Sequence, residues 1–334
     1  MEKNKRHQQP IYLQAGYFRK DFYDDYTSLE LTSSTNWGHN CTYQLLPNGL
    51  TGEHKFIQLH TMQISYGIRP GGMMNDIYSA SDCISIAVMQ KVADKACFDR
   101  MKLKVDDIFI FDDSQAFNFM SNDAIEFAVI SVKKSALGTT LLPLFLDACN
   151  HRVKDTQQHF SSLLEKLWID ISEKNTHDSF EVIEESILSR IEDLLKSQNL
   201  IVSKLTKGEE IALIIRDQLY HHMDGKVSIS SLSKQHAVSE KTLQNSFKSL
   251  FGFTPKLFLR QLKLNLVHHD LVNSSSNYTT VSRIAQKWGF THMGRFSQYY
   301  TILFGENPSV TLNKPKPPIH NISPSCVLTQ EEMY

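Results

Sequence analysis

The chain has 334 residues, of which 41% are hydrophobic and 21% charged, and its formal net charge is -1. This length suffices for two ordinary domains, and the near-average composition excludes wholesale disorder, collagen-like sequence and coiled coils. The longest apolar runs fall well short of the ~18 residues that a bilayer span needs. The first residues lead into no apolar signal segment, so we expect a cytoplasmic protein with no membrane partner.

The near-neutral charge hides an asymmetry between the two halves of the chain. Residues 207–314 contain 13 Lys and Arg against 7 Asp and Glu, residues 1–206 contain 21 against 27, and residues 315–334 contain 1 against 2. Binding to a polyanion requires a basic surface, and the 207–314 region carries an excess of 6 positive charges. The charge pattern therefore makes this region the candidate for nucleic-acid binding.

The cysteines are scattered along the chain and never form a CxxC pair. Their odd number and irregular spacing predict neither a disulfide framework nor a zinc site, and we expect mostly buried thiols. They are Cys41, Cys83, Cys97, Cys149 and Cys326.

Short strands separated by turns are predicted for residues 41–132. The runs 56–64 and 83–89 partly alternate at period two, and residues 107–132 predict two or three further strands. Turns are expected at residues 47–49, 51–52, 69–72, 106–107 and 112–113. We therefore expect residues 1–152 to form a β-rich domain, an antiparallel sandwich or barrel.

Aromatic residues on these predicted strands have two interpretations. They either belong to the core, which we favour, or line a ligand pocket. They are Phe56, Tyr66, Tyr78, Phe109 and Phe117.

Helical spacing replaces the strand pattern after Lys133. Apolar residues three and four apart predict amphipathic helices within 160–171 and 183–195, which lie in a helical linker at 153–206. These helices either pack on the sheet or join a second copy of the chain. An all-helical region follows at 207–314, with helices over 209–223 and 254–272, and residues 224–225 end the first of these. The Pro-rich start of residues 315–334 predicts an extended tail.

The helical region contains an internal repeat. Leu232, Val238 and Ser239 match Ile284, Phe290 and Thr291 at a shift of 52, whereas Leu243, Phe247, Phe251, Gly252 and Pro255 match Phe296, Tyr300, Phe304, Gly305 and Pro308 at a shift of 53. Each copy predicts a short helix, a tight turn and a longer helix capped by the Ser239 or Thr291 hydroxyl. This pattern is typical of a helix-turn-helix, present here twice.

The second helix of such a unit enters the DNA major groove and holds its apolar residues against the first helix. The apolar set would be Leu243, Phe247 and Leu250 in the first copy and Phe296, Tyr300 and Leu303 in the second. The outward residues are polar side chains that can pair with base edges or phosphates. The candidate DNA-binding residues are Ser239, Glu240, Lys241, Gln244, Asn245, Lys248, Thr291, His292, Met293, Arg295 and Gln298.

The 254–272 helix would separate the two copies by ~28 Å at ~1.5 Å per residue. One turn of DNA is ~34 Å long. A single chain could therefore place two helices in successive major grooves.

These motifs resemble the AraC family of bacterial transcription regulators over about residues 209–312. The most specific matches are residues 238–248 (VSEKTLQNSFK), 288–300 (WGFTHMGRFSQYY) and 303–309 (LFGENPS). The first two resemble most the branch that contains the ethanolamine-utilisation operon regulator, and residues 44–49 and 106–108 are similar to it in outline. Asn245 and Gln298 stand where family members often have Arg, so the preferred bases and the phosphate anchoring are expected to differ.

The resemblance implies a transcription activator that binds double-stranded promoter DNA, with RNA polymerase as a partner and a cupin-like N-terminal domain. That domain would bind a small-molecule effector, or it would serve for homodimerisation or contact with another protein. Both alternatives stay open at this point.

Other chemistry is poorly supported. No GxGxxG, GxxxxGK[ST], GxSxG or HExxH motif occurs, so we expect no enzyme and no cofactor. The pairs His221-His222 and His268-His269 diverge by about 100° on a helix, and only Glu53-His54 approaches a cupin-like metal pattern, so we expect no metal. A DNA-repair methyltransferase with a similar helical module would need an activated cysteine, which no local cluster suggests.

Overall fold

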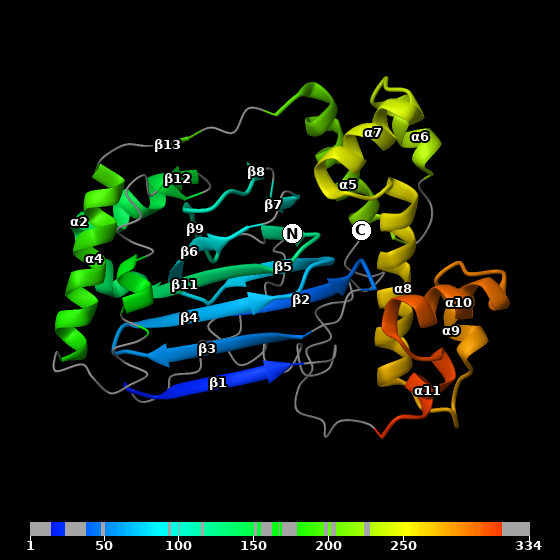
Figure 1. Ribbon diagram of the computed structural model, residues 1–334, viewed down its shortest axis with the longest axis horizontal. Coiled ribbons are helices and arrows are strands. Elements are labelled where there is room, and N and C mark those ends of the chain that lie inside the picture. Colours follow the sequence, from blue (N-terminus) through cyan, green and yellow to red (C-terminus); the bar gives the residue numbers. More distant parts are fainter. Residues whose placement is uncertain are drawn as a thin grey trace.

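The computed structural model describes residues 15–23, 38–47, 51–92, 95–99, 101–114, 117–149, 152–154, 162–166, 168, 179–196, 200–201, 205–223 and 228–315. Its N-terminal half holds two antiparallel sheets, and its C-terminal half is helical (Figure 1). This confirms the expected α+β class, with strands first and helices after them. Within the described part of the chain, no helix is long and apolar enough to cross a bilayer.

The described strands form one sheet of eight and one of five. The larger sheet runs, in spatial order, β1 (Phe18–Tyr23), β3 (Gly52–Gln58), β4 (Met62–Arg69), β11 (Ile125–Lys133), β6 (Cys83–Lys91), β9 (Asp107–Asp112), β12 (Arg152–Lys154) and β13 (Leu200–Ile201). The smaller runs β2 (Gly38–Gln44), β5 (Met73–Ser79), β10 (Phe117–Ser121), β7 (Ala96–Phe98) and β8 (Met101–Lys102).

Most predicted strands and turns in this half are confirmed. Strand β6 covers the 83–89 run, β9 to β11 are the strands expected within 107–132, and the 69–72 turn joins β4 to β5. The 56–64 run is a correction, because it is a hairpin rather than one strand. Gln58 pairs with Gln63 across the turn, and Leu59 N–H donates to the Met62 carbonyl oxygen at 2.8 Å.

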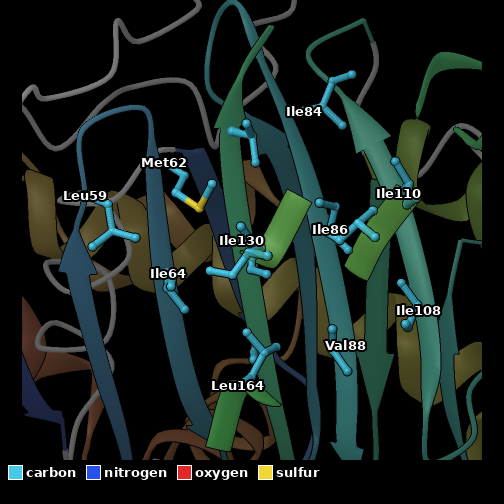
Figure 2. Close-up of a cluster of buried hydrophobic side chains, with 14 of the residues drawn as sticks. Leu59, Met62, Ile64, Ile84, Ile86, Val88, Ile108, Ile110, Ile130 and Leu164 are labelled. Atoms are coloured by element: carbon cyan, nitrogen blue, oxygen red, sulfur yellow. The ribbon is translucent and has the colours of Figure 1, made fainter. Parts of the chain in front are cut away.

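Two layers of apolar side chains hold the sheets. One face of the larger sheet packs against α2 (Lys134–Ala148), α4 (Phe180–Lys196), Leu164 and Trp168 through a cluster rich in Ile, part of which Figure 2 shows. Between the two sheets lies a second cluster rich in Phe, which includes Phe109 and Phe117. Phe56 is also buried, whereas Tyr66 is partly buried beside the first cluster. The side chain of Tyr78 lies outside the described residues.

The linker helices pack on the sheet. Ile183, Ile187 and Ile191 of α4 are buried there, and residues 162–166 and 168 are helical within the predicted 160–171 helix. Strands β12 and β13 lie in the same segment and extend the larger sheet. The sequence pattern does not foresee α2, where Gly138 has a non-helical φ of 58° and Pro143 lies inside the helix.

The described helices of the C-terminal half are α5 (Lys207–His221), α6 (Ile229–Gln235), α7 (Glu240–Phe251), α8 (Pro255–Asn273), α9 (Val281–Lys287), α10 (Met293–Phe304) and α11 (Pro308–Asn313). Helices α5 and α8 confirm the predicted 209–223 and 254–272 helices, each shifted by one or two residues. Residues 48–49, 224–225 and the tail beyond Pro315 lie outside the described part of the chain.

Helix α8 contributes apolar side chains to two separate helical cores. Phe258, Leu262 and Leu266 pack with α5 to α7. Leu264 and Leu271 instead pack with α9 to α11. In Figure 1, α6 and α7 lie near one end of α8 and α9 to α11 lie near the other. The strand ends of the N-terminal half face α8 from the side opposite α2 and α4.

Candidate nucleic-acid interface

Two helix pairs with the same backbone plan make up the predicted repeat. We call α6 and α7 the first pair and α9 and α10 the second pair. The short helices α6 and α9 have 7 residues each and begin 52 positions apart, whereas the longer helices α7 and α10 have 12 residues each and begin 53 positions apart. The one-residue difference therefore lies in the turn of the second pair.

The two turns reverse the chain in the same way. Ala237 in the first turn has a φ of 52°, and Gly289 at the equivalent position has a φ of 85°. The next residue then donates its N–H back to the short helix: Val238 to the Ser233 carbonyl oxygen and Phe290 to the Ala285 carbonyl oxygen, both at 3.0 Å. Left-handed residues of this kind commonly end helices and satisfy their last carbonyl groups.

The helix starts differ between the pairs. The Ser239 hydroxyl accepts a hydrogen bond from Thr242 N–H at 3.0 Å, so the predicted cap of α7 is confirmed. The prediction for Thr291 is wrong: His292 is the N-cap residue of α10, and its side chain makes no capping hydrogen bond. The extra residue in the second turn moves Thr291 one position outside the helix.

The predicted apolar faces of the longer helices are buried. In the first pair, Leu243, Phe247 and Leu250 are at most 2% exposed, and the equivalent Phe296, Tyr300 and Leu303 are buried to the same extent. Phe247 packs among Phe251 and other rings, and the Tyr300 hydroxyl donates to Thr311 Oγ1 at 2.9 Å. The outward face of each longer helix is thus fixed by the packing of its inner face.

The candidate residues lie on these outward faces with one exception. Met293 is only partly exposed and packs against the second core. The others are exposed: Ser239, Glu240, Lys241, Gln244, Asn245 and Lys248 at the first pair, and Thr291, His292, Arg295 and Gln298 at the second.

The two outward faces differ in their cationic side chains. At the structural shift of 53, Lys241 corresponds to Gly294 and Lys248 corresponds to Thr301. Within its 12 residues, α7 contains two lysines and one glutamate, whereas the basic residue of α10 is Arg295. The longer helix of the first pair therefore offers two cationic side chains to a polyanion and that of the second pair offers one, although Glu240 leaves α7 with the same net charge as α10.

Each turn is tied to the long helix that precedes its pair. His236 Nε2 lies 2.9 Å from Gln218 Oε1 of α5, and at the equivalent position Trp288 Nε1 donates to Asp270 Oδ2 of α8 at 2.8 Å. Burial alone would raise the pKa of Asp270, but hydrogen bonds from His269, Lys287 and Trp288 lower it. The Asp270 carboxylate therefore anchors the second turn.

One feature of the second pair is not apparent from the sequence. The Arg260 guanidinium carbon of α8 lies 4.0 Å from the centre of the Tyr299 ring of α10. Such cation–π contacts stabilise by about 0.5–1 kcal/mol at exposed sites and more when desolvated. The stacking of Arg260 on Tyr299 joins α8 to α10.

The described thiols are unsuited to nucleophilic chemistry. Burial raises the pKa of Cys83 to about 12 and that of Cys97 and Cys149 to about 11. A thiol with a raised pKa has little of the reactive thiolate at neutral pH.

The two residues that approach a cupin-like metal pattern in the sequence are Glu53 and His54. His54 is buried, and burial, Arg69 and Arg19 lower its pKa to about 3. Glu53 forms an ion pair with Lys20 at 3.1 Å.

The comparisons with known proteins agree with this geometry. Residues 232–314 match a family model described as a helix-turn-helix domain. The XylDLEGF operon transcriptional activator of Pseudomonas putida is 31% identical over 130 residues, which are 39% of this chain and 40% of that protein. The "Probable thc operon regulatory protein" of Rhodococcus erythropolis is 32% identical over 96 residues, 29% of each chain. The chain thus spans less than half the length of these relatives.

A solved structure gives a further likeness. It is titled "a probable AraC family transcriptional regulator from Rhodopseudomonas palustris", is 25% identical, covers 32% of this chain and 99% of its own, and has a TM-score of 0.30. The matched residues 232–314 contain the second pair and all of the first pair except the first three residues of α6. Residues 232–314 of this chain are therefore similar to a helix-turn-helix domain.

Proposed function

We propose that the chain is a transcription regulator, an activator, that reads double-stranded promoter DNA with two helix-turn-helix units. The observation that carries the proposal is the duplicated geometry: two equivalent longer helices, each with a buried apolar face and an exposed polar face. In such units the longer helix lies in the major groove. Helices α7 and α10 would therefore read two half-sites, which we call the first and the second half-site respectively.

The proposed contacts divide by chemistry. Gln244, Asn245 and Gln298 carry amides that can pair with adenine, whereas Lys241, Lys248 and Arg295 can bind guanine or phosphate. The remaining proposed contacts are Ser239, Glu240, Thr291, His292 and Met293. Helix α8 has 19 residues and would span ~28 Å, close to one turn of DNA.

We assign residues 1–152 to a regulatory, cupin-like domain, 153–206 to the linker and to homodimerisation, 207–314 to DNA binding and 315–334 to a tail. RNA polymerase would be the protein partner of an activator. The motifs at 238–248 and 288–300 favour the branch that contains the ethanolamine-utilisation regulator.

Selection of DNA from a random pool by the full chain tests the proposal. We expect a site with two conserved blocks about one helical turn apart, and binding that weakens as salt rises. Recovery of no preferred sequence would overturn the function.

The regulatory domain has two candidate roles, and a small-molecule effector is the one we favour. The two sheets enclose a layer of side chains, and an effector must bind the DNA-competent state more tightly to shift the balance. A metabolite panel that changes neither the melting temperature nor the affinity for the selected site would favour control by dimerisation or by a protein partner. The raised thiol pKa values disfavour a DNA-repair enzyme.

A further inference from the structure

The edge strand β2 contacts the helical half in two chemically different ways. Tyr43 and Leu45 belong to the same apolar cluster as Leu213 and Phe247 of the first core. The Tyr43 and Tyr220 rings meet edge to face at 5.6 Å. Apolar packing therefore holds the first pair against the smaller sheet, and α5 is held there also by the Tyr220 hydroxyl, which lies 3.1 Å from the Tyr43 hydroxyl and donates to Asp76.

The last residue of β2, Gln44, is joined to α8 through its main chain. Gln44 N–H donates to Asn265 Oδ1 at 2.8 Å, and Asn265 Nδ2 donates back to the Gln44 carbonyl oxygen at 2.7 Å. The Asn265 amide thus pairs with both main-chain groups of Gln44, as a neighbouring strand would. Both residues are buried, at 4% and 3% exposed, so these bonds are shielded from water.

The side chain of Gln44 reaches further, to the second pair. Gln44 Nε2 donates to the Leu303 carbonyl oxygen of α10 at 2.8 Å and to the Leu46 carbonyl oxygen at 3.1 Å. Leu303 lies in the last turn of α10, where carbonyl groups lack an intrahelical donor. Gln44, 259 positions away, therefore supplies a hydrogen-bond donor to one of the last carbonyl groups of this helix.

We propose that Gln44 is a positioning residue through which the N-terminal half sets the orientation of α10 on the second half-site. The proposal rests on the proposed function and adds that the N-terminal half holds the two helix pairs in different ways. The first pair is held by a shared apolar core, whereas the second pair is held to the sheet by the Gln44 amide. Removal of this amide changes reading by α10 and leaves reading by α7 unchanged.

The experiment uses the full chain and the two-block site that the wild-type chain selects. Gln244→Ala and Gln298→Ala first identify which block each helix reads. Gln44→Met keeps the side-chain length but removes the donor, and Gln44→Asn keeps an amide that is one methylene too short. Gln58→Met is the matched control, because Gln58 is equally buried and its Nε2 donates to the Leu59 and Met62 carbonyl oxygens within the N-terminal half.

The measured quantity is the ratio of affinities for the intact site and for a site with one block scrambled. We expect both Gln44 variants to lower discrimination at the second block by about threefold to tenfold, which corresponds to one hydrogen bond. Both Gln44 variants should discriminate at the first block as wild type does. Gln58→Met should discriminate as wild type does at both blocks. Equal losses at both blocks, no loss, or failure of both Gln44 variants to fold would overturn the proposal. A wild-type chain that selects no site would overturn the proposed function itself.

Discussion

The first and second helix pairs share a backbone plan but differ in the cationic side chains of their longer helices, in their turns and in their attachment. The first pair presents Lys241 and Lys248 and shares an apolar core with the smaller sheet. The second presents Arg295, has an extra turn residue, and meets the sheet through Gln44. A duplicated unit can thus keep its packing while its two copies are attached differently to the rest of the chain. In the proposed function, Lys241 and Lys248 of the first pair would contact phosphates, and Gln44 would align the second pair.

The largest effect is expected for base reading by the first pair. Gln244→Ala should cost about 1–3 kcal/mol of binding free energy at the first half-site, because an exposed amide that pairs with a base edge is lost. The equivalent residue in α10 is Ser297, which is only partly exposed, so Ser297→Ala is the control and should change affinity little. Equilibrium binding to single-base variants of the site measures both. A larger loss in the Ser297 variant would reverse the order of the pairs.

The attachment of α5 to the smaller sheet should depend on pH. Burial raises the pKa of Asp76 to about 6, although the Tyr220 hydroxyl that donates to it and the nearby Arg216 act in the opposite direction. The pKa of Asp76 is higher in the folded state than in the unfolded state. The stabilisation of the folded state by the neutral Asp76 carboxyl is therefore fully present below about pH 4 and is lost as the pH rises through 6.

Asp76→Asn should remove this loss. The free energy of unfolding of the variant, relative to wild type, should rise between pH 4 and pH 7 by an amount on the order of 2 kcal/mol. Denaturant titrations at several pH values measure it. The Gln44 and Asn265 amides, which join the smaller sheet to α8 and α10, are neutral and add no such pH dependence. If the difference in the free energy of unfolding between Asp76→Asn and wild type did not change with pH, the role of Asp76 would be contradicted.

A smaller effect is expected for the phosphate contacts. Lys248→Ala should weaken binding to all sequences alike and lower the salt slope by about 1, because one counterion-releasing contact is lost. Thr301→Ala, at the equivalent position of α10, should leave the slope unchanged. Affinity measured over a range of salt concentrations tests the pair. Equal slopes in both variants would show that the lysine makes no phosphate contact.

The smallest effects concern the two turns. Gly289→Ala should destabilise the helical half by about 1 kcal/mol, since a side chain disfavours the left-handed backbone there. Ala237→Gly removes the same strain from the first turn and should be neutral or slightly stabilising. Thermal unfolding of the two variants compares them directly. The opposite order would mean that the equivalent turns are held by different contacts.

The sequence predicts the helical half well because its signals are local. The buried positions of α7 and α10 follow from apolar spacing, and Ser239 is a recognisable cap. The predicted cap at Thr291 is wrong because one residue inserted in the turn moves the helix start, although the residue types still match those of the first pair. The turn after β3 has no Gly, Pro, Asn or Asp, so the 56–64 run resembles a single strand.

Contacts between distant parts of the chain leave no such signal. The Gln44 bond to α10 joins residues 259 positions apart, and no periodicity marks it. The stacking of Arg260 on Tyr299 likewise depends on how α8 and α10 cross. Gly138 and Pro143 interrupt the helical pattern of α2, which explains its absence from the prediction. The assignment of individual side chains to bases stays a prediction.

Helix α8 would also restrict how the proposed DNA site can change in evolution. Its two sets of apolar residues belong to different cores, so one residue inserted between Leu262 and Leu264 would turn the second pair by about 100° and move it by ~1.5 Å. Both cores and the Gln44 bond would then be lost together. If the two helix pairs read two half-sites as proposed, single substitutions would change the bases of either half-site, whereas a new spacing between half-sites would require several changes at once.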